Sequence, residues 1–157
     1  SGGRPASADA GRPGARGRPA AALNGCDFRP VVLQRAPAAG EVAALRQGLG
    51  RPVLDLSALN DDLDGMLALL SLLDDSVAVS NTNVHLVAAL GRTARVLLPS
   101  PPEYRWLVAG ETSPWFPGFQ LYRHDRATGW PHALARVADA LGRAFVRGGK
   151  PFDPLAG

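Results

Sequence analysis

Short apolar runs of the strand type alternate along this chain with longer segments whose apolar residues recur at helical spacing. Strands are predicted at residues 31–34, 52–56, 77–79, 94–98 and 119–122. Helices are predicted at residues 41–48, 60–73, 83–90 and 131–146. This alternation is typical of βαβ units. We therefore expect an α/β fold, with a Rossmann-like parallel sheet flanked by helices.

The most clearly patterned helix follows the second predicted strand. Asn60 is expected to cap it, and Asp61, Asp62 and Asp64 favour the positive end of the helix dipole. Its apolar side chains should form one stripe that faces the sheet. These are Leu63, Met66, Leu67, Leu70 and Leu73. A contrasting segment, residues 99–118, contains five prolines and predicts a long irregular loop of the kind that often carries function.

The length and composition predict one folded domain with tails. Residues 1–29 are rich in Gly, Arg, Pro and Ala and predict a disordered basic tail. The domain is expected over residues 30–150, followed by a C-terminal tail at 151–157. No apolar run reaches the roughly 18 residues of a membrane span, so no transmembrane segment is expected. The missing initiating Met suggests a fragment whose neighbours are absent.

Charge and cysteine content narrow the functional classes. The net charge of +3 comes from residues 1–29, with five Arg and two Asp, because residues 30–157 carry twelve basic and twelve acidic side chains. We therefore expect no nucleic-acid partner. Cys26 is the only cysteine, which excludes an internal disulfide and favours a cytoplasmic setting. The three histidines form no close cluster, so no metal or other cofactor is predicted.

The candidate site follows the third predicted strand, where Ser80, Asn81, Thr82 and Asn83 precede a helix. Phosphates bind at such helix N-termini, although the same side chains can simply cap the helix. His85 in the first turn can reach a phosphate, assist proton transfer or merely pack. Without a Gly-x-Ser-x-Gly elbow, a hydrolase built on Ser80 and His85 is not expected. No catalytic residue is assigned.

Several segments together resemble a known family. They are residues 31–35, 72–74, 77–86, 89–92 and 96–99, with the motifs Pro102–Leu107, Ser113–Pro117 and Leu121–Arg123. They resemble the C-terminal half of GT-B, heptosyltransferase-like (family 9-like) glycosyltransferases, in particular the domains that follow tetratricopeptide repeats in bacterial proteins. The resemblance covers about residues 30–146.

This resemblance implies a Rossmann-like domain that binds a nucleotide-diphosphate sugar donor. The activity implied is hexosyl or heptosyl transfer, completed by an N-terminal half that this chain lacks. A protein or glycan acceptor would be bound through that missing half. The family usually has Asp-Thr-Ser or Asp-Thr-Gly where residues 80–82 stand here, and its histidine is retained as His85.

Further donor-binding residues follow from the same resemblance. Gln34 and Arg35 stand where related enzymes contact the donor phosphates with a Gln and a basic residue. Arg105 suits bidentate pairing with a diphosphate. Trp106 either stacks on a sugar or base or pins the loop, and for Trp115 packing is favoured.

Two other readings stay open at this point. The replacement of the family's acid by Ser80 and the missing half favour a degenerate, non-catalytic scaffold or interaction module. A generic nucleotide-binding regulatory domain would bind nucleotide without regard to a sugar. The donor's sugar and base, the acceptor and the oligomeric state are undetermined by the sequence.

Overall fold

The computed structural model describes Leu23 and residues 26–145, and it has the predicted α/β class. The elements are, in chain order, β1 (Val31–Val32), α2 (Glu41–Leu49), β2 (Leu54–Asp55), the 3₁₀ helix η1 (Ser57–Asp61), α3 (Leu63–Leu72), β3 (Val77–Val79), α4 (Thr82–Ala89), β4 (Arg95–Leu98), the 3₁₀ helix η2 (Tyr104–Trp106), β5 (Gln120–Arg123) and α5 (Pro131–Ala144).

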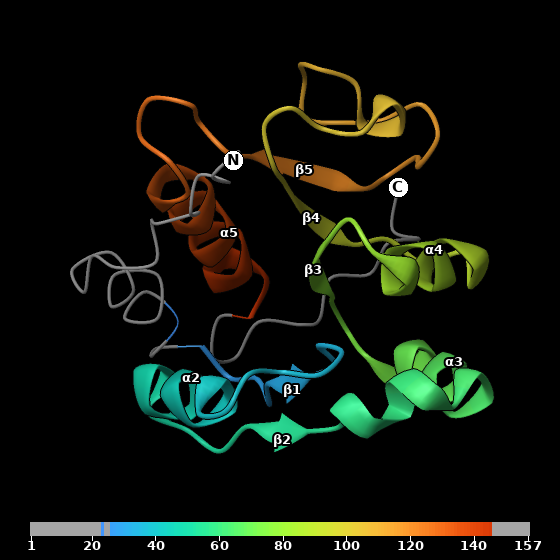
Figure 1. The fold of residues 1–157 in the computed structure, drawn as a ribbon, viewed down its shortest axis with the longest axis vertical. Coiled ribbons are helices and arrows are strands. Elements are labelled where there is room, and N and C mark those ends of the chain that lie inside the picture. The colour runs from blue at the N-terminus through green and yellow to red at the C-terminus, as the bar shows by residue number, and fades with distance from the viewer. Residues whose placement is uncertain (1–22, 24–25, 146–157) are drawn as a thin grey trace, which may run out of the picture.

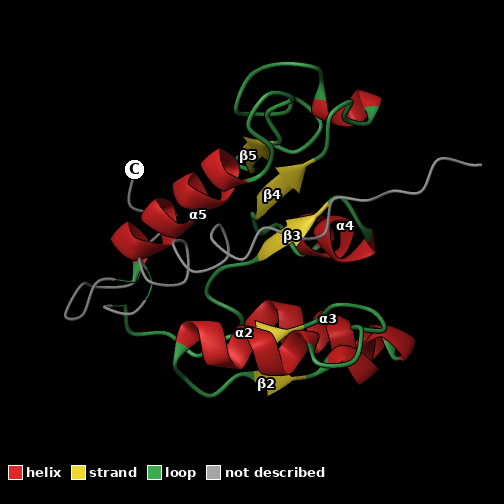
Figure 2. Ribbon diagram, turned by 60° about the vertical axis from the view of Figure 1, so that its left-hand side comes forward, coloured by secondary structure: helices red, strands yellow, loops and turns green. Residues whose placement is uncertain are grey.

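All the strands pair in parallel, as βαβ connections require, but they form two sheets in the described part of the chain. β1 pairs with β2, and β3, β4 and β5 form a second sheet in that order. In Figures 1 and 2 the small sheet lies below the larger one, with α2 beside it. The single sheet expected from the sequence is therefore two sheets, because β1 and β3 do not pair with each other.

Helices cover both faces of the larger sheet. Val96 and Leu98 of β4 are fully buried on one face, in a cluster with side chains of α3 and α4. Leu97 points to the other face, where Tyr122 packs against α5. Figure 1 shows α5 and α4 on opposite sides of these strands. The alternation of side chains along β4 thus places a helical layer on each face.

The N-terminus of α3 differs from the sequence prediction. Asp62, and not Asn60, is the N-cap, and its side chain accepts a hydrogen bond from Gly65 N at 3.0 Å. Asn60 lies in η1, and its amide donates to the carbonyl oxygens of Leu33 at 3.0 Å and Ser57 at 2.8 Å. Asn60 therefore links η1 to the end of β1 instead of capping the helix.

The apolar stripe of α3 is narrower than predicted. Met66 and Leu70 are buried in the core, whereas Leu63 keeps 58% of its surface exposed. Burial of a side chain of this size contributes roughly 1.5–3 kcal/mol. Within the described ranges, no helix combines the length and the apolar character needed to cross a bilayer.

The long loop between β4 and β5 is tied to the sheet by one arginine. The guanidinium of Arg123 donates to the carbonyl oxygens of Trp106 at 2.6 Å, Leu107 at 2.9 Å and Gly110 at 2.7 Å. Burial lowers the pKa of Arg123. These hydrogen bonds hold η2 and the segment after it against the end of β5.

Packing begins earlier in the chain than the predicted boundary at residue 30. Cys26 is buried, Asp27 N donates to Phe145 O at 3.0 Å, and the rings of Phe28 and Phe145 lie 6.0 Å apart. Arg51 donates to the carbonyl oxygens of Cys26 and Phe28. Residues 26–28 thus contact α5 and Arg51 just before the predicted boundary at residue 30. The predicted tails otherwise fall on residues outside the described ranges, as does Val146 at the end of the last predicted helix.

Candidate functional site

A small cavity lies where the carboxyl ends of β1 and β3 approach each other. Its volume is about 180 Å³, and it is lined from one side by Leu33, Arg35 and Asn60 and from the other by residues 81–83 at the start of α4. The carboxyl ends of parallel strands are the usual ligand-binding edge of such sheets. The structure therefore brings four of the predicted site residues, Arg35, Asn81, Thr82 and Asn83, to one cavity.

The N-terminus of α4 combines a cap with the open end of a helix. Asn81 is the N-cap, and its side-chain oxygen accepts a hydrogen bond from Val84 N at 3.3 Å. The first N–H groups of a helix have no partner within the helix, and the helix dipole makes this end attractive to anions. Capping and phosphate binding are thus compatible here. The Asn81 side chain accepts from the N–H group of Val84, and residues 81–83 still line the cavity.

Arg35 and Gln34 have different surroundings. Arg35 lines the cavity, is 68% exposed and lies 3.3 Å from Asp61 in an ion pair. Its guanidinium also donates to Asn60 O at 2.6 Å. Gln34 does not line the cavity; it donates to Glu41 at the start of α2, at 2.9 Å. Of this predicted pair, only Arg35 is placed to contact an anion in the cavity.

The other predicted residues form a second cluster, beside the first turn of α4. Ser80 accepts a hydrogen bond from Trp106 Nε1 at 2.9 Å and donates to Glu103 Oε1 at 3.1 Å. Arg105 Nη1 lies 3.0 Å from His85 Nε2. Arginine can only donate, so His85 Nε2 accepts and its proton is on Nδ1. The loop of residues 99–118 is therefore fastened to β3 and α4 by polar contacts.

Glu103 is a member of this cluster that the sequence reasoning missed. Its Oε2 lies 3.1 Å from Arg105 Nε, close enough for an ion pair but without the alignment of a hydrogen bond. Half of its side chain is exposed. The available signal was an acid directly before the Tyr104-Arg105-Trp106 segment, but nothing local indicated that it would reach Ser80.

The tryptophans of the loop take opposite positions. Trp106 is completely buried and stacks on Phe116 at 4.6 Å, so packing is the role that the structure shows. Phe116 also meets His85 edge-on at 5.3 Å. The prediction that Trp115 packs is wrong, because 64% of its surface is exposed. In the turn that begins at Ser113, Phe116 and not Trp115 points inward.

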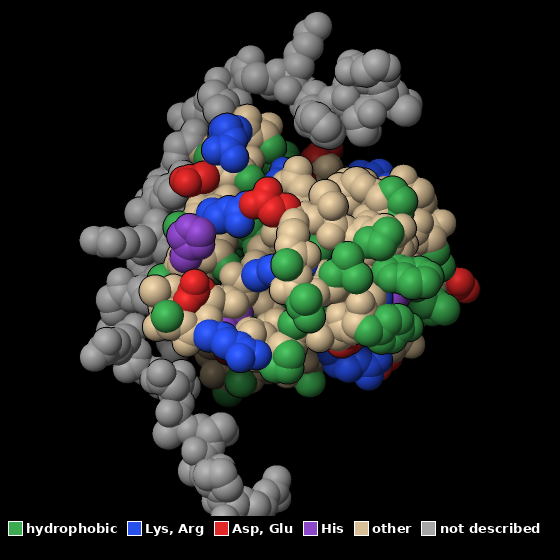
Figure 3. All heavy atoms as spheres, turned by 90° about the horizontal axis from the view of Figure 1, so that it is seen from above, with side chains coloured by type: hydrophobic (Ala, Val, Ile, Leu, Met, Phe, Trp, Pro, Cys, Tyr) green, Lys and Arg blue, Asp and Glu red, His purple; other side chains and the backbone are tan. Residues whose placement is uncertain are grey.

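Figure 3 looks down on the top of the molecule, and hydrophobic side chains gather on the right of this face. On the loop itself the exposed large hydrophobics are Tyr104, Leu107, Val108 and Trp115.

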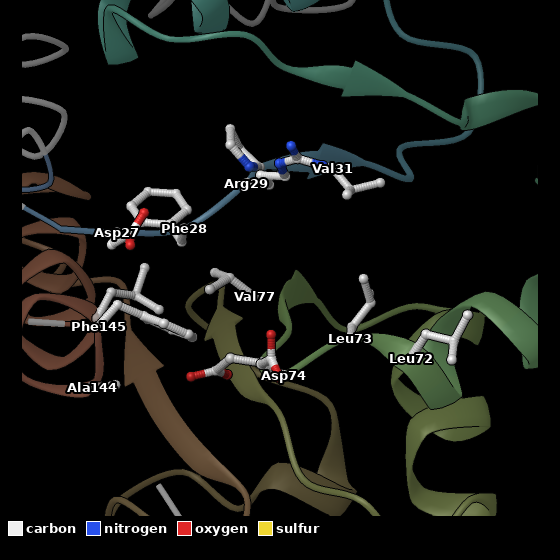
Figure 4. A pocket seen from close by; sticks show the side chains of 13 residues that line it. Asp27, Phe28, Arg29, Val31, Leu72, Leu73, Asp74, Val77, Ala144 and Phe145 are labelled. Atoms are coloured by element: carbon white, nitrogen blue, oxygen red, sulfur yellow. The ribbon is translucent and has the colours of Figure 1, made fainter. Parts of the chain in front are cut away.

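A larger cavity, of about 550 Å³, lies at the opposite ends of β1 and β3. Figure 4 shows Phe28 and Phe145 on one side of it and Val77, Leu73 and Asp74 nearby. Its walls come from the segments that precede these two strands and from the end of α5, away from the edge where parallel sheets bind ligands. We therefore place the candidate site at the smaller cavity, where the predicted polar residues meet.

In the described part of the chain, no three His, Cys, Asp or Glu side chains come together as a ligand set for a metal ion. His124 contacts the ring of Trp130, with centroids 4.9 Å apart. His132 and Asp125 line a different hollow, beside β5 and α5. His124 also lines this hollow, so His124 and His132 lie near each other, whereas His85 lies on α4.

Comparisons with family models, curated proteins and solved structures find no match to this chain. What the fold and site define is an α/β protein with two parallel sheets. A cavity with polar lining residues lies between the two sheets, at the carboxyl ends of β1 and β3.

Proposed function

We propose that this chain binds the diphosphate of a nucleotide-diphosphate sugar at the start of α4. The observation that carries the proposal is that Arg35 and the capped N-terminus of α4 line one cavity at the carboxyl ends of β1 and β3. A cation and a helix N-terminus facing the same space favour a multiply charged anion. The cavity volume of about 180 Å³ suits a diphosphate, so the nucleoside and sugar would extend outside it.

The second cluster, which contains Ser80, His85 and Arg105, lies at the same end of α4 as the proposed diphosphate site. Ser80 directly precedes the α4 cap, and the Arg105–His85 pair lies beside the first turn of that helix. Arg105 adds a second guanidinium beside this helix, outside the cavity lining and paired with Glu103. In glycosyl transfer the diphosphate departs with increasing negative charge, and donors already in place stabilise it electrostatically. The proposed role of this chain is therefore donor binding and leaving-group stabilisation in a glycosyltransferase.

The acceptor and the general base belong, in this proposal, to an N-terminal half outside this chain. The chain alone is accordingly expected to bind donor without transferring sugar. Assays with a nucleotide sugar and no partner half should show no transfer beyond spontaneous hydrolysis.

Calorimetric titration of the chain with UDP, ADP and GDP tests the proposal. At least one nucleotide should bind, and Arg35→Met should weaken it about tenfold, which is the effect of losing one charge-assisted hydrogen bond. Arg126→Met is the matched control, because Arg126 contacts Ser100 and does not line the cavity. Absence of heat with all three nucleotides would contradict donor binding.

The alternative, a non-catalytic scaffold, is favoured by one specific observation. Ser80, His85, Arg105 and Trp106 each contact another member of the cluster or Glu103, so the cluster is held together without a ligand. In that case Arg105→Met should lower the free energy of unfolding, while no nucleotide raises the melting temperature of the unaltered chain. Thermal shift measurements with the same three nucleotides separate the two functions.

A further inference from the structure

Glu103 places a carboxylate beside the carboxyl end of β3, within a group of hydrogen-bond donors. It is the residue before η2, and its backbone is extended, with φ −65° and ψ 153°. Ser80 Oγ donates to its Oε1, and Arg105 Nε approaches its Oε2. These two contacts come from different segments, so they fix the position of the carboxylate relative to both β3 and the loop.

The carboxylate retains capacity for further hydrogen bonds. A carboxylate offers about four lone-pair sites, and the two described contacts use only part of them. Half of the Glu103 side chain is exposed, so the remaining sites are open to solvent. Such a group accepts from hydroxyls, whereas it repels phosphate.

The two ends of a nucleotide sugar therefore have separate recognition elements in this site. Arg35 and the start of α4 attract phosphate, and Glu103 accepts from hydroxyl groups. Glu103 itself lies outside the cavity lining, but Ser80, which donates to it, directly precedes the α4 cap Asn81, which lines the cavity.

We propose that Glu103 is a specificity-determining residue that accepts hydrogen bonds from ring hydroxyls of the ligand. This inference rests on the proposed nucleotide binding. The hydroxyls belong either to the ribose or to the transferred sugar, which share the same chemistry. Pyrophosphate has neither and serves as the reference ligand.

The test compares three ligands by calorimetry. They are inorganic pyrophosphate, the tightest binder among UDP, ADP and GDP, and the glucose conjugate of that nucleotide. Glu103→Gln should leave the Kd of pyrophosphate within about twofold while weakening the nucleotide or its conjugate about tenfold, the effect of one charge-assisted hydrogen bond. Weakening of both assigns the ribose hydroxyls, and weakening of the conjugate alone assigns the sugar.

The controls separate recognition from structure. Glu111→Gln removes another acid of the same loop, one that pairs with Arg136, and it should change none of the three affinities. Glu103→Asp keeps a carboxylate and should restore part of the hydroxyl-dependent affinity. Circular dichroism checks that Glu103→Gln is folded, and Glu103→Asp is measured in its place if it is not.

Three results overturn the inference in distinguishable ways. Equal weakening of all three ligands would show that Glu103 only maintains the site. Unchanged affinities in a folded Glu103→Gln chain would show that it contacts no hydroxyl. No binding of any ligand by the unaltered chain would refute the proposed function as well.

Discussion

The side-chain amide nitrogen of Asn83 lies 3.4 Å from the carbonyl oxygen of Leu33, fifty residues earlier in the chain. The same oxygen accepts a hydrogen bond from Asn60 at 3.0 Å. These contacts join the first turn of α4 to the end of β1, and thus tie the two sheets at the edge where the candidate site lies. At the other end of the same strands the sheets border the cavity of about 550 Å³.

Replacement of Asn83 by Asp should weaken this connection. The change substitutes an acceptor for the donor that faces the Leu33 carbonyl, so the free energy of unfolding should fall by about 1–2 kcal/mol. Urea unfolding followed by circular dichroism measures it. Asn81→Asp is the matched control, because aspartate is an equally good N-cap and should leave stability nearly unchanged. Equal effects of the two substitutions would contradict the linking role of Asn83.

The Arg95–Asp75 ion pair should contribute more to stability than the surface pair at the cavity. Arg95 Nη2 lies 2.8 Å from Asp75 Oδ2, and their side chains are 13% and 17% exposed. Burial alone lowers the pKa of Arg95, but Asp75 and Tyr122 outweigh it and the pKa is raised. Asp75→Asn should therefore cost about 2 kcal/mol, somewhat less than the disruption of a fully buried pair.

Asp61→Asn provides the comparison for that measurement. Asp61 is 84% exposed in its pair with Arg35, so its loss should change the free energy of unfolding by less than about 0.5 kcal/mol. Both variants can be measured by urea unfolding at neutral pH. A smaller cost for Asp75→Asn than for Asp61→Asn would refute the assignment.

The cap of α3 gives a third prediction. Asp62→Ala removes the acceptor for Gly65 N and should lower the free energy of unfolding by about 1 kcal/mol. Asp64→Ala, in the first turn of the same helix, loses only a favourable charge near the helix dipole and should cost a few tenths of a kcal/mol. Thermal unfolding of both variants distinguishes a cap from a general charge effect.

The turn after β5 gives a prediction about pH. The backbone N–H groups of Thr128 and Ala127 donate to the carboxylate of Asp125 and lower its pKa below the usual value for an aspartate. Because the pKa in the folded chain is below that in the unfolded chain, the ionised carboxylate stabilises the fold. This stabilisation is fully present above the unfolded pKa of about 3.9 and is lost as the pH falls through the folded pKa.

Asp125→Ala should accordingly be less stable than the unaltered chain at neutral pH. The difference between the two chains should shrink under acid conditions. Unfolding measured across a pH series tests this, and carboxyl NMR titration gives the midpoint directly. A constant difference over the whole series would contradict the role of the ionised form.

The sequence by itself determined the α/β class, the order of the elements and the position of the polar turn at residues 80–83 before a helix. These features depend on local periodicity and on the residues that begin helices, and the nearest neighbours in the chain supply both. The start of α4 shows the limit of this reasoning. The sequence allows capping by the side chains of this turn, whereas nothing in it indicates the contact of Asn83 with Leu33.

Only the tertiary structure decided which distant groups meet. The strands form two sheets, and Asn60 bonds to the end of β1 instead of capping α3. Trp106 is buried whereas Trp115 is exposed, and Glu103 contacts Ser80. Asn60 and its partner Leu33 are 27 residues apart in the chain, and Glu103 and its partner Ser80 are 23 residues apart. Their meeting depends on the path of the intervening loops and on competition for buried space, neither of which is encoded in the pattern of adjacent residues.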